Sequence, residues 1–269
     1  ELAQVFARFG SQVTIIEGAD RILPPEEPEA SQIITDALSA EGITIHTGQF
    51  ASSVSHDGSE FTVMVGDKQV RGERLLVATG RGSNAPALGA DVLGVELQRG
   101  FLPVDDHMQV VPGVYAVGDI AGKGAFTHMA MYQAGICERA ILGQQGPGAD
   151  YSAVPHVTFT DPEVGSVGMT EQQARDAGLT VVTGSTSVPS TSRGWIHKVG
   201  NEGIIKVVVD ADRGVLVGAT SVGPTGGEVL SGLAVAVRGA VPVATLKNMI
   251  YAYPTIWRGI EAAIQDTGL

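Results

Sequence analysis

The first 80 residues alternate between helical and strand-like segments, and this order restricts the fold more than any other feature of the chain. Apolar residues recur at helical spacing over residues 1–9, and a short apolar strand at 13–17 follows. A second helix at about 27–40 and a second strand at 43–47 continue the alternation. Helices that alternate with apolar strands indicate an α/β layer architecture.

The helix at 1–9 begins with no cap, no preceding loop and no methionine. Domains rarely begin inside a helix, so we expect that the sequence is truncated at its start. Three short strands are predicted near 50–55, 60–65 and 68–71, followed by a buried strand over Arg74–Ala78.

The rest of the chain divides into two further regions. Residues 81–150 are rich in loops and contain a short strand at 114–117 and a helix at about 126–142. From 151 onward, paired strands with a hairpin signal at Ala211–Gly214 indicate an antiparallel sheet with segregated helices. A capping box at Thr170 opens a short helix, and Pro254 is predicted to begin the last one. We therefore predict three domains, at 1–80, 81–150 and 151–269.

Charge and composition exclude several classes of protein. The net charge of -12 gives no electrostatic attraction for nucleic acid or an anionic membrane. No apolar run approaches the roughly 20 residues that span a bilayer, and no signal peptide opens the chain. The single cysteine, Cys137, cannot form an internal disulfide or a zinc cluster. A cytoplasmic protein is the expectation.

Glu17 ends the strand at 13–17, where a dinucleotide-binding βαβ unit places an acid. Such an acid accepts hydrogen bonds from the adenosine ribose hydroxyls and repels the 2′-phosphate of NADP. A solvated acid at a strand end is the alternative, and Arg21 could soften the preference for NAD. Further along, the predicted strand over Arg74–Ala78 leads into Gly80, where the backbone could approach a nucleotide closely because glycine has no side chain.

A second candidate site lies in the middle region. The strand at 114–117 ends in Gly118-Asp119, and a helix begins near Ala125. An acid at a sheet edge can accept from a sugar-like hydroxyl, and a helix N-terminus presents N–H groups and a partial positive charge. This pair suits a flavin, with the acid on the ribityl chain and the helix end stabilising negative charge on the reduced ring.

Three segments resemble motifs of the pyridine nucleotide-disulfide oxidoreductase family. Ala78–Asn84 resembles its ATGRxPN segment, and Tyr115–Asp119 resembles its second flavin motif. Phe159–Gly168 is similar to the opening of its dimerisation domain. The resemblance implies incomplete NAD and FAD domains made of α/β layers, followed by an α+β dimerisation domain with an antiparallel sheet.

The resemblance also implies roles for individual residues. Glu17 and Gly80 would contact the nicotinamide nucleotide, with Ala51 beside its adenine. Residues 151–269 would form a homodimer interface and complete the partner subunit's active site. The residues implied to contact FAD are Gly118, Asp119, Ala125, Phe126, Thr127 and His128.

One segment departs from the family pattern. Members that handle thiols carry His-Pro-Thr-x-x-Glu where this chain has Tyr253 for the histidine and Arg258 for the glutamate. Tyrosine, with a pKa near 10, is a poor proton shuttle at neutral pH, and arginine cannot accept a hydrogen bond. Tyr253 is a candidate catalytic residue or a packing aromatic at an interface.

A basic, aromatic cluster lies in an expected loop and consists of Arg193, Trp195 and His197. It is interpreted either as an acceptor site or as a surface turn.

We therefore predict an FAD-dependent NAD(P)H oxidoreductase that uses NAD(H) in preference to NADP(H). Hydride would pass from the nicotinamide to the flavin, and electrons onward to a small non-thiol acceptor such as a quinone or a second nicotinamide. The first alternative is a dihydrolipoamide dehydrogenase or mercuric reductase-like disulfide oxidoreductase, which a Cys-x4-Cys pair upstream of Glu1 would support. The second is a non-catalytic dimerisation fragment.

Overall fold

A computed structural model describes all residues from 1 to 269, and the chain forms two compact units. The first unit consists of residues 1–75 and 152–269, and the second of residues 76–151. Each is described by itself. No helix is both long enough and apolar enough to span a membrane.

The N-terminal part of the first unit contains a β-α-β unit with parallel strands. β1 and β2 pair in parallel, and α2 connects them. The three short strands predicted near 50–55, 60–65 and 68–71 form a separate antiparallel sheet in the order β3-β4-β5. The elements are α1 (Leu2–Arg8), β1 (Thr14–Ile16), α2 (Pro28–Ala40), β2 (Thr44–His46), β3 (Ala51–His56), β4 (Phe61–Val65) and β5 (Lys68–Gly72).

The C-terminal part of the first unit is an antiparallel sheet of five strands in the order β10-β11-β12-β9-β8. Helices α6 and α8 pack on one face of this sheet and bury Ile205, Val207 and Val209 of β11. The elements are β8 (Pro155–Thr158), β9 (Glu163–Gly168), α4 (Glu171–Asp176), β10 (Val181–Ser187), α5 (Ser192–His197), β11 (Ile204–Asp210), β12 (Val215–Gly223), α6 (Gly226–Arg238), α7 (Val243–Lys247) and α8 (Gly259–Asp266). The predicted antiparallel domain and its capping box at Thr170 are confirmed.

The second unit is built around one helix and a small core. Short 3-10 helices and the two-stranded sheet β6-β7 precede α3, and Ala85, Ala90, Leu102 and Ala116 form the core. The elements are η1 (Ala85–Leu88), η2 (Ala90–Leu93), β6 (Gln109–Val111), β7 (Val114–Tyr115), η3 (Gly118–Ala121) and α3 (Thr127–Ile141).

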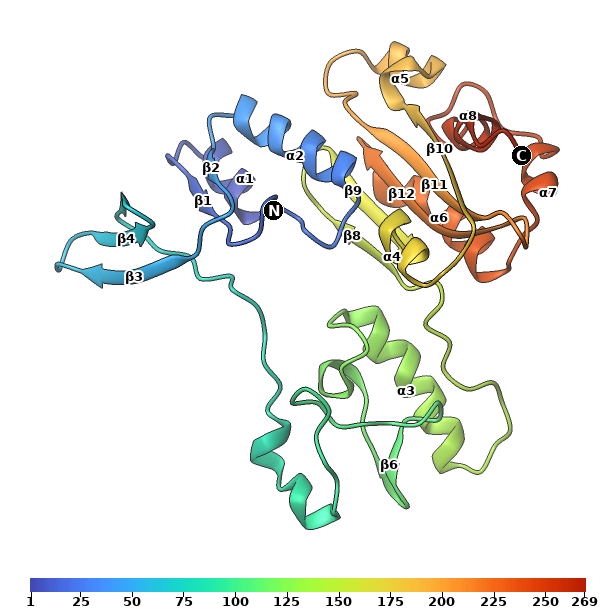
Figure 1. The fold of residues 1–269 in the computed structure, drawn as a ribbon, viewed down its shortest axis with the longest axis horizontal. Helices are drawn as coiled ribbons and strands as arrows, with labels where there is room; N and C mark the ends of the chain where they lie inside the picture. The colour runs from blue at the N-terminus through green and yellow to red at the C-terminus, as the bar shows by residue number, and fades with distance from the viewer. The chain divides into compact units, whose positions relative to one another are not determined.

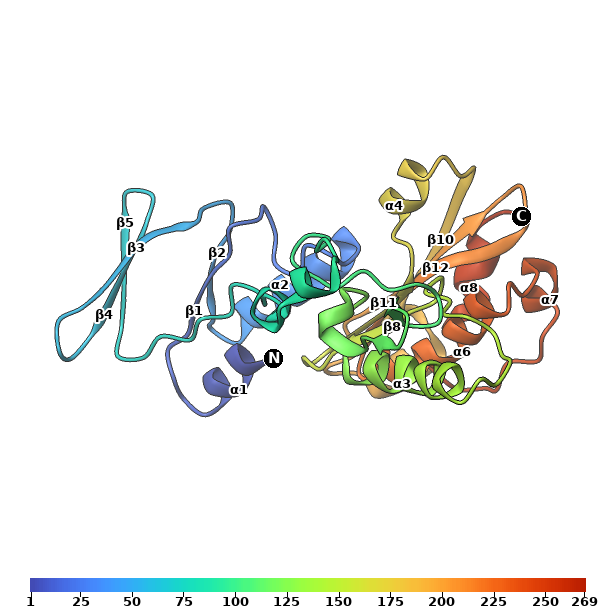
Figure 2. The same ribbon diagram turned by 90° about the horizontal axis from the view of Figure 1, so that it is seen from below.

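Helix α2 joins the two parts of the first unit. It lies between the β1–β2 pair and the five-stranded sheet in both views (Figures 1 and 2). Ile34 and Leu38 of α2 share one buried cluster with Val164 of β9 and Val222 of β12. The α/β segment and the antiparallel sheet therefore have a common core.

A row of polar residues crosses the other face of the five-stranded sheet, opposite α6 and α8. Alternation along β11 turns Lys206 away from the valines that face those helices. The strand register aligns Lys206 with Thr220, and Thr220 with Ser166. The full row across the five strands is Ser185, Lys206, Thr220, Ser166 and His156.

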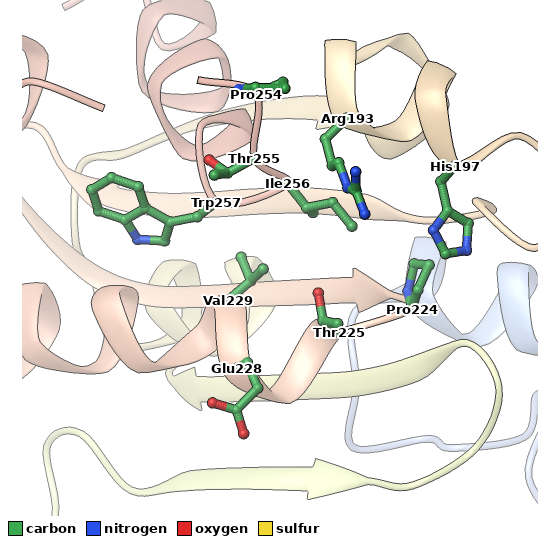
Figure 3. Close-up of a pocket in the computed structure, with 10 residues that line it drawn as sticks. All are labelled: Arg193, His197, Pro224, Thr225, Glu228, Val229, Pro254, Thr255, Ile256 and Trp257. Carbon is green, nitrogen blue, oxygen red and sulfur yellow. The ribbon is translucent and has the colours of Figure 1, made fainter. Parts of the chain in front are cut away.

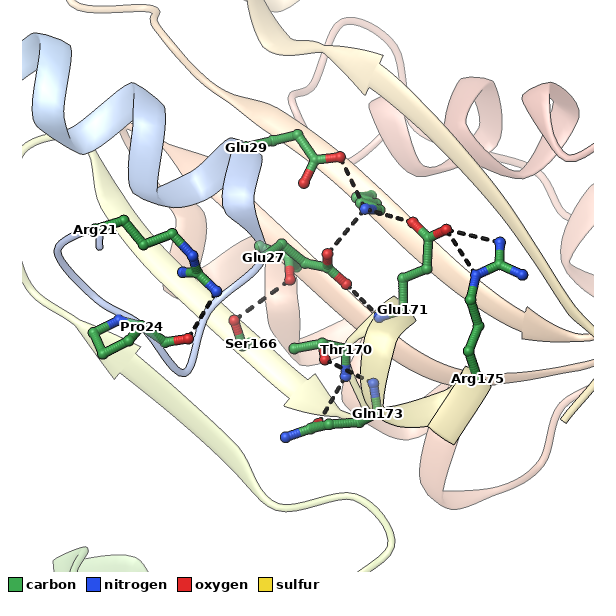
Figure 4. A network of polar contacts seen from close by, with 11 residues as sticks. Arg21, Pro24, Glu27, Glu29, Ser166, Thr170, Glu171, Gln173 and Arg175 are labelled. Atoms are coloured by element: carbon green, nitrogen blue, oxygen red, sulfur yellow. Dashed lines mark hydrogen bonds and ion pairs between the residues drawn. The ribbon is translucent and has the colours of Figure 1, made fainter. Parts of the chain in front are cut away.

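The loop before α2 supplies acids to this row (Figure 4). The Lys206 ammonium, whose side chain is only 6% exposed, lies 2.9 Å from Glu27, 2.8 Å from Glu29 and 3.0 Å from Glu171. Burial alone would lower the pKa of Lys206, but the hydrogen bonds to these three carboxylates outweigh burial and raise it. Lys206 is therefore held in its charged form.

Glu26, the residue before Glu27, contacts two other residues of the polar row. Its carboxylate lies 2.8 Å from Nε2 of His156 and accepts a short hydrogen bond from the Ser166 hydroxyl. Burial alone would raise the pKa of Glu26, but the bonds from His156 and Ser166 outweigh it and hold the pKa below its usual value. At the other end of α2, Glu41 pairs with Arg8 at 2.6 Å.

Three expectations about elements are wrong. The segment predicted as a buried strand over Arg74–Ala78 is exposed and is not a strand. No strand of the chain forms backbone hydrogen bonds with it, so its N–H and C=O groups must bond to water at the surface. The last helix begins at Gly259 and not at Pro254, because the preceding residues turn to place Ile256 in the core. The loop expected around Arg193 is the short helix α5, which the Thr191 hydroxyl caps by accepting from the Gly194 N–H.

Replacing Lys206 with methionine tests the role of the buried ammonium. Lys206→Met leaves the buried Glu27 carboxylate without its cation, so we expect the free energy of unfolding to fall by about 3–5 kcal/mol. Urea unfolding of the full-length protein at neutral pH measures the change. Arg175→Gln, which removes an exposed partner of Glu171, is the control and should cost about 1 kcal/mol or less. Equal small losses in both variants would contradict the assignment.

Candidate functional site

Glu17 lies directly after β1, at the end of the parallel pair. Its backbone N–H donates to the His46 carbonyl at 2.8 Å and extends the β1–β2 ladder by one bond. One carboxylate oxygen accepts from the Ala19 N–H at 2.9 Å. The second oxygen has no protein partner, so it is available to a hydroxyl group at the strand end.

Arg21 is directed away from this carboxylate. Its guanidinium donates to the carbonyl oxygens of Leu23 at 3.0 Å and Pro24 at 2.8 Å. Both contacts hold it to its own loop, and Figure 4 shows the one to Pro24. In this conformation Arg21 forms no ion pair with Glu17.

Ala51 is the first residue of β3, and an aromatic ring adjoins it. The ring of Phe50 lies so close over Gly18 that a Cβ at that position would overlap with it. Gly18 is therefore required for the chain segments on either side, at Glu17 and at Ala51, to approach each other. This contact could not be predicted from the sequence because neither Gly18 nor Phe50 belongs to a motif.

Gly80 and Asp119 both belong to the second unit. Gly80 has a positive φ of 117°, which favours glycine, and it follows the segment over 74–78, which has no regular secondary structure. The next residue, Arg81, places its guanidinium 3.2 Å from the Asp119 carboxylate. This exposed ion pair links the segment after Gly80 to η3.

Gln133 positions the backbone beside Asp119. Its side chain, which is fully buried at 0% exposure, accepts from the Gly118 N–H at 2.6 Å and donates to the Tyr151 hydroxyl at 3.1 Å. Gly118 has a φ of 77°, and a Cβ there would lie 3.3 Å from Ala130. Gln133 lies within an otherwise ordinary amphipathic helix, so only its burial after folding identifies it.

The start of α3 lies next to η3, and Ala125 and Thr127 are exposed there. Phe126 is the N-cap residue, and no side chain caps the helix. The rings of Phe126 and His128 stack with centroids 5.1 Å apart. An uncapped N-terminus of a 15-residue helix beside an acid is an arrangement that suits an anionic or polar ligand.

Tyr253 is 68% exposed and precedes the last helix. The Arg258 guanidinium lies 5.6 Å from the centroid of its ring and 3.1 Å from the Glu261 carboxylate. Arg258 therefore cannot orient Tyr253 through a hydrogen bond in the way that an acid orients a histidine. Glu261 already forms an ion pair with Arg258 and does not contact Tyr253 in place of the missing acid.

A pocket of about 470 Å³ adjoins this segment within the first unit (Figure 3). Arg193 and His197 of α5 line it, whereas Trp195 of the same cluster does not. The remaining lining residues are Pro224, Thr225, Glu228, Val229, Pro254, Thr255, Ile256 and Trp257.

The predicted site residues thus form three groups. Glu17 and Ala51 come together through Gly18 and Phe50, and Asp119 lies with Gly118 and the start of α3. Tyr253 directly precedes Pro254, which lines the pocket. The first and third groups belong to the first unit and the second to the other.

Comparisons with known proteins match nearly the whole chain. A family model described as pyridine nucleotide-disulphide oxidoreductase matches residues 1–134, and the model of its dimerisation domain matches residues 154–264. Mercuric reductase of Bacillus cereus is 33% identical over 98% of this chain and 43% of its own length. Dihydrolipoyl dehydrogenase of Geobacillus stearothermophilus is 33% identical over 98% of this chain and 57% of its own length.

Solved structures resemble the chain over the same extent. LpdA from Mycobacterium tuberculosis has a TM-score of 0.88 at 25% identity and covers 98% of this chain and 58% of its own. The HOCl-induced flavoprotein disulfide reductase RclA from Escherichia coli has a TM-score of 0.84 at 26% identity, over 100% and 61%. The chain thus spans about half the length of the curated relatives that it matches.

Substitution of Gln133 tests whether it positions the backbone at Asp119. Gln133→Leu leaves the Gly118 N–H buried without an acceptor, so we expect a loss of about 1–3 kcal/mol in stability. If this site holds the flavin that the family resemblance implies, the flavin that co-purifies with the full-length protein should fall as well, because Gly118 and Asp119 would shift. Urea unfolding and flavin absorbance per protein are the measurements. Gln145→Leu, at an exposed position, is the control, and equal behaviour of the two variants would refute the assignment.

Proposed function

Because the chain belongs to the pyridine nucleotide-disulphide oxidoreductase family, we propose that it is part of a cytoplasmic, homodimeric, FAD-dependent enzyme that oxidises NAD(P)H. The observation that carries the proposal is the arrangement around Asp119. An exposed acid, a glycine with positive φ held by a buried glutamine, and an uncapped helix start lie together there. Residues 151–269 would form the dimer interface.

The residues present fit a flavin. Asp119 would accept hydrogen bonds from the ribityl hydroxyls, in exchange for or beside its ion pair with Arg81. Gly118 would let the flavin approach the backbone, and residues Ala125, Phe126, Thr127 and His128 would surround the ring at the start of α3. When bound, the flavin supplies hydride transfer with the nicotinamide and passes the electrons on.

The nicotinamide nucleotide would be NAD(H) in preference to NADP(H). The free carboxylate oxygen of Glu17 would accept from the adenosine ribose, and its charge would repel a 2′-phosphate. Arg21 is bound to Leu23 and Pro24 and does not neutralise that charge. Ala51 and Gly80 would contact the adenine and the rest of the nucleotide.

For the acceptor, we propose a disulfide or a thiol-bound metal ion. The support comes from relatives named mercuric reductase and dihydrolipoyl dehydrogenase, and from a structural relative named disulfide reductase. These relatives favour this interpretation over the non-thiol acceptor that we expected from Tyr253. Since Cys137 is the only cysteine, a redox cysteine pair would have to lie outside these 269 residues.

A second candidate, reduction of a quinone or a second nicotinamide, rests on Tyr253 and Arg258. Tyr253 is exposed, and Arg258 packs over its ring and pairs with Glu261. Without an oriented acid-base pair, this segment would not move protons for a thiol. An acceptor that takes electrons directly from the flavin would need no such pair.

Anaerobic titration with NADH tests the proposed function. We expect excess NADH to bleach the flavin absorbance of the full-length protein, since a redox cysteine pair would take the first two electrons, and NADPH to do so at concentrations about tenfold higher or more because Glu17 repels its phosphate. Glu17→Gln should narrow this difference. A flavin that stays oxidised with both nucleotides would refute the proposal.

The acceptor is tested on the same bleached protein. If the acceptor is a disulfide, lipoamide should restore the flavin absorbance faster than a benzoquinone at the same concentration. Alkylation of the reduced protein with iodoacetamide should abolish the lipoamide reaction and spare the quinone reaction. Faster reoxidation by the quinone, with no effect of alkylation, would instead establish the second candidate.

A further inference from the structure

Two side chains of opposite charge lie on the loop between β1 and α2 and bear on the choice of nucleotide. Glu17, at the start of the loop, would accept from the adenosine ribose and repel a 2′-phosphate. Arg21 would attract that phosphate if its guanidinium were free, because guanidinium and phosphate form strong paired hydrogen bonds. The guanidinium is instead bound to the carbonyl oxygens of Leu23 and Pro24. The preference for NADH therefore depends on the contacts that keep Arg21 there.

The Leu23 carbonyl connects Arg21 to Glu26. It accepts from the Arg21 guanidinium at 3.0 Å and from the Glu26 N–H at 3.0 Å. Leu23 has a φ of 50°, which is unusual for a bulky residue and persists only where neighbouring contacts fix it. The positive charge of Arg21 is also attracted to the Glu26 carboxylate. The position of Arg21 thus depends on the position of Glu26.

Glu26 is in turn fixed by two side chains of the five-stranded sheet. It is buried, and each of its carboxylate oxygens has a partner there. Oε1 lies 2.8 Å from Nε2 of His156 on β8, and Oε2 accepts from the Ser166 hydroxyl on β9. Removal of the His156 ring would leave a buried carboxylate oxygen without this donor, a loss that favours movement of Glu26 towards water.

From these contacts we propose that His156 is a positioning residue that sets the preference for NADH over NADPH. Through Glu26 and the Leu23 carbonyl, it keeps the Arg21 guanidinium bound to its own loop, so that the Glu17 carboxylate alone meets the ribose. Without His156, the loop would release Arg21 to pair with a 2′-phosphate. The inference rests on the proposed function, because it concerns how that nucleotide site discriminates.

Anaerobic flavin bleaching of the full-length protein tests the inference. The half-saturating concentrations of NADH and NADPH are measured, and their ratio gives the preference. His156→Leu should narrow this ratio by about threefold or more, through better use of NADPH, and leave the maximal bleaching rates within about twofold. His156→Gln, whose amide can still donate to Glu26, should keep the ratio of the parent protein.

Thr220→Val is the matched control. Thr220 lies in the same polar row, with its hydroxyl 3.5 Å from that of Ser166, and forms no hydrogen bond with the loop before α2. This variant should leave the ratio within about twofold of the parent. A role of His156 in stability alone predicts equal losses for both nucleotides in His156→Leu, and that result would overturn the proposal.

A further variant needs no change at Glu26. Arg21→Gln alone should leave the use of both nucleotides within about twofold, because the guanidinium is bound to the loop, but it should remove the gain in NADPH use when combined with His156→Leu. Weaker NADPH use in Arg21→Gln alone would overturn the proposal even if His156→Leu does not fold. Failure of both nucleotides to bleach the parent would instead refute the proposed function, and this inference with it.

Discussion

The buried ammonium of Lys206 is the contact on which the arrangement of the first unit depends. Three carboxylates surround it, two from the segment before and at the start of α2 and one from α4. A charge in this position is tolerated only because its partners are complete, and loss of any one buried partner leaves another uncompensated. The pairing therefore specifies how the β1-α2-β2 segment docks on the antiparallel sheet, to a degree that the apolar contacts of α2 alone would not.

The contact between the loop before α2 and Lys206 also determines where Glu17, the proposed nucleotide-binding residue, lies. The loop from Glu17 to Glu27 begins at the ladder bond to His46 and ends at the bonds to Lys206 and to the Glu171 N–H. Both of its ends are held by buried or ladder contacts, and Arg21 closes its middle onto Leu23. A carboxylate on such a loop is presented in a fixed direction, and this is what recognition of a ribose requires.

The sequence allowed prediction of the elements with strong periodicity and of residues inside recognisable motifs. α2, β11, β12 and the capping box at Thr170 follow from local pattern and are found as expected. The strand expected over Arg74–Ala78 failed because strand formation depends on a partner, which local pattern does not reveal. The buried roles of Lys206 and Gln133 were not predicted, for a related reason. A lysine in a valine-rich strand is expected to face solvent, and only the carboxylates of a loop distant in sequence make its burial possible.

We propose that one domain would hold a nicotinamide nucleotide at Glu17, that another would hold a flavin at Asp119 and the start of α3, and that hydride would pass between the two. Stopped-flow mixing of the oxidised full-length protein with NADH, and with NADH deuterated at C4, tests this claim most directly. We predict that flavin bleaching is slowed by deuterium at one of the two C4 positions, because breaking that C–H bond is part of the step. Flavin reduction with no isotope effect at either position in single-turnover rates, or no reduction at all, would contradict it.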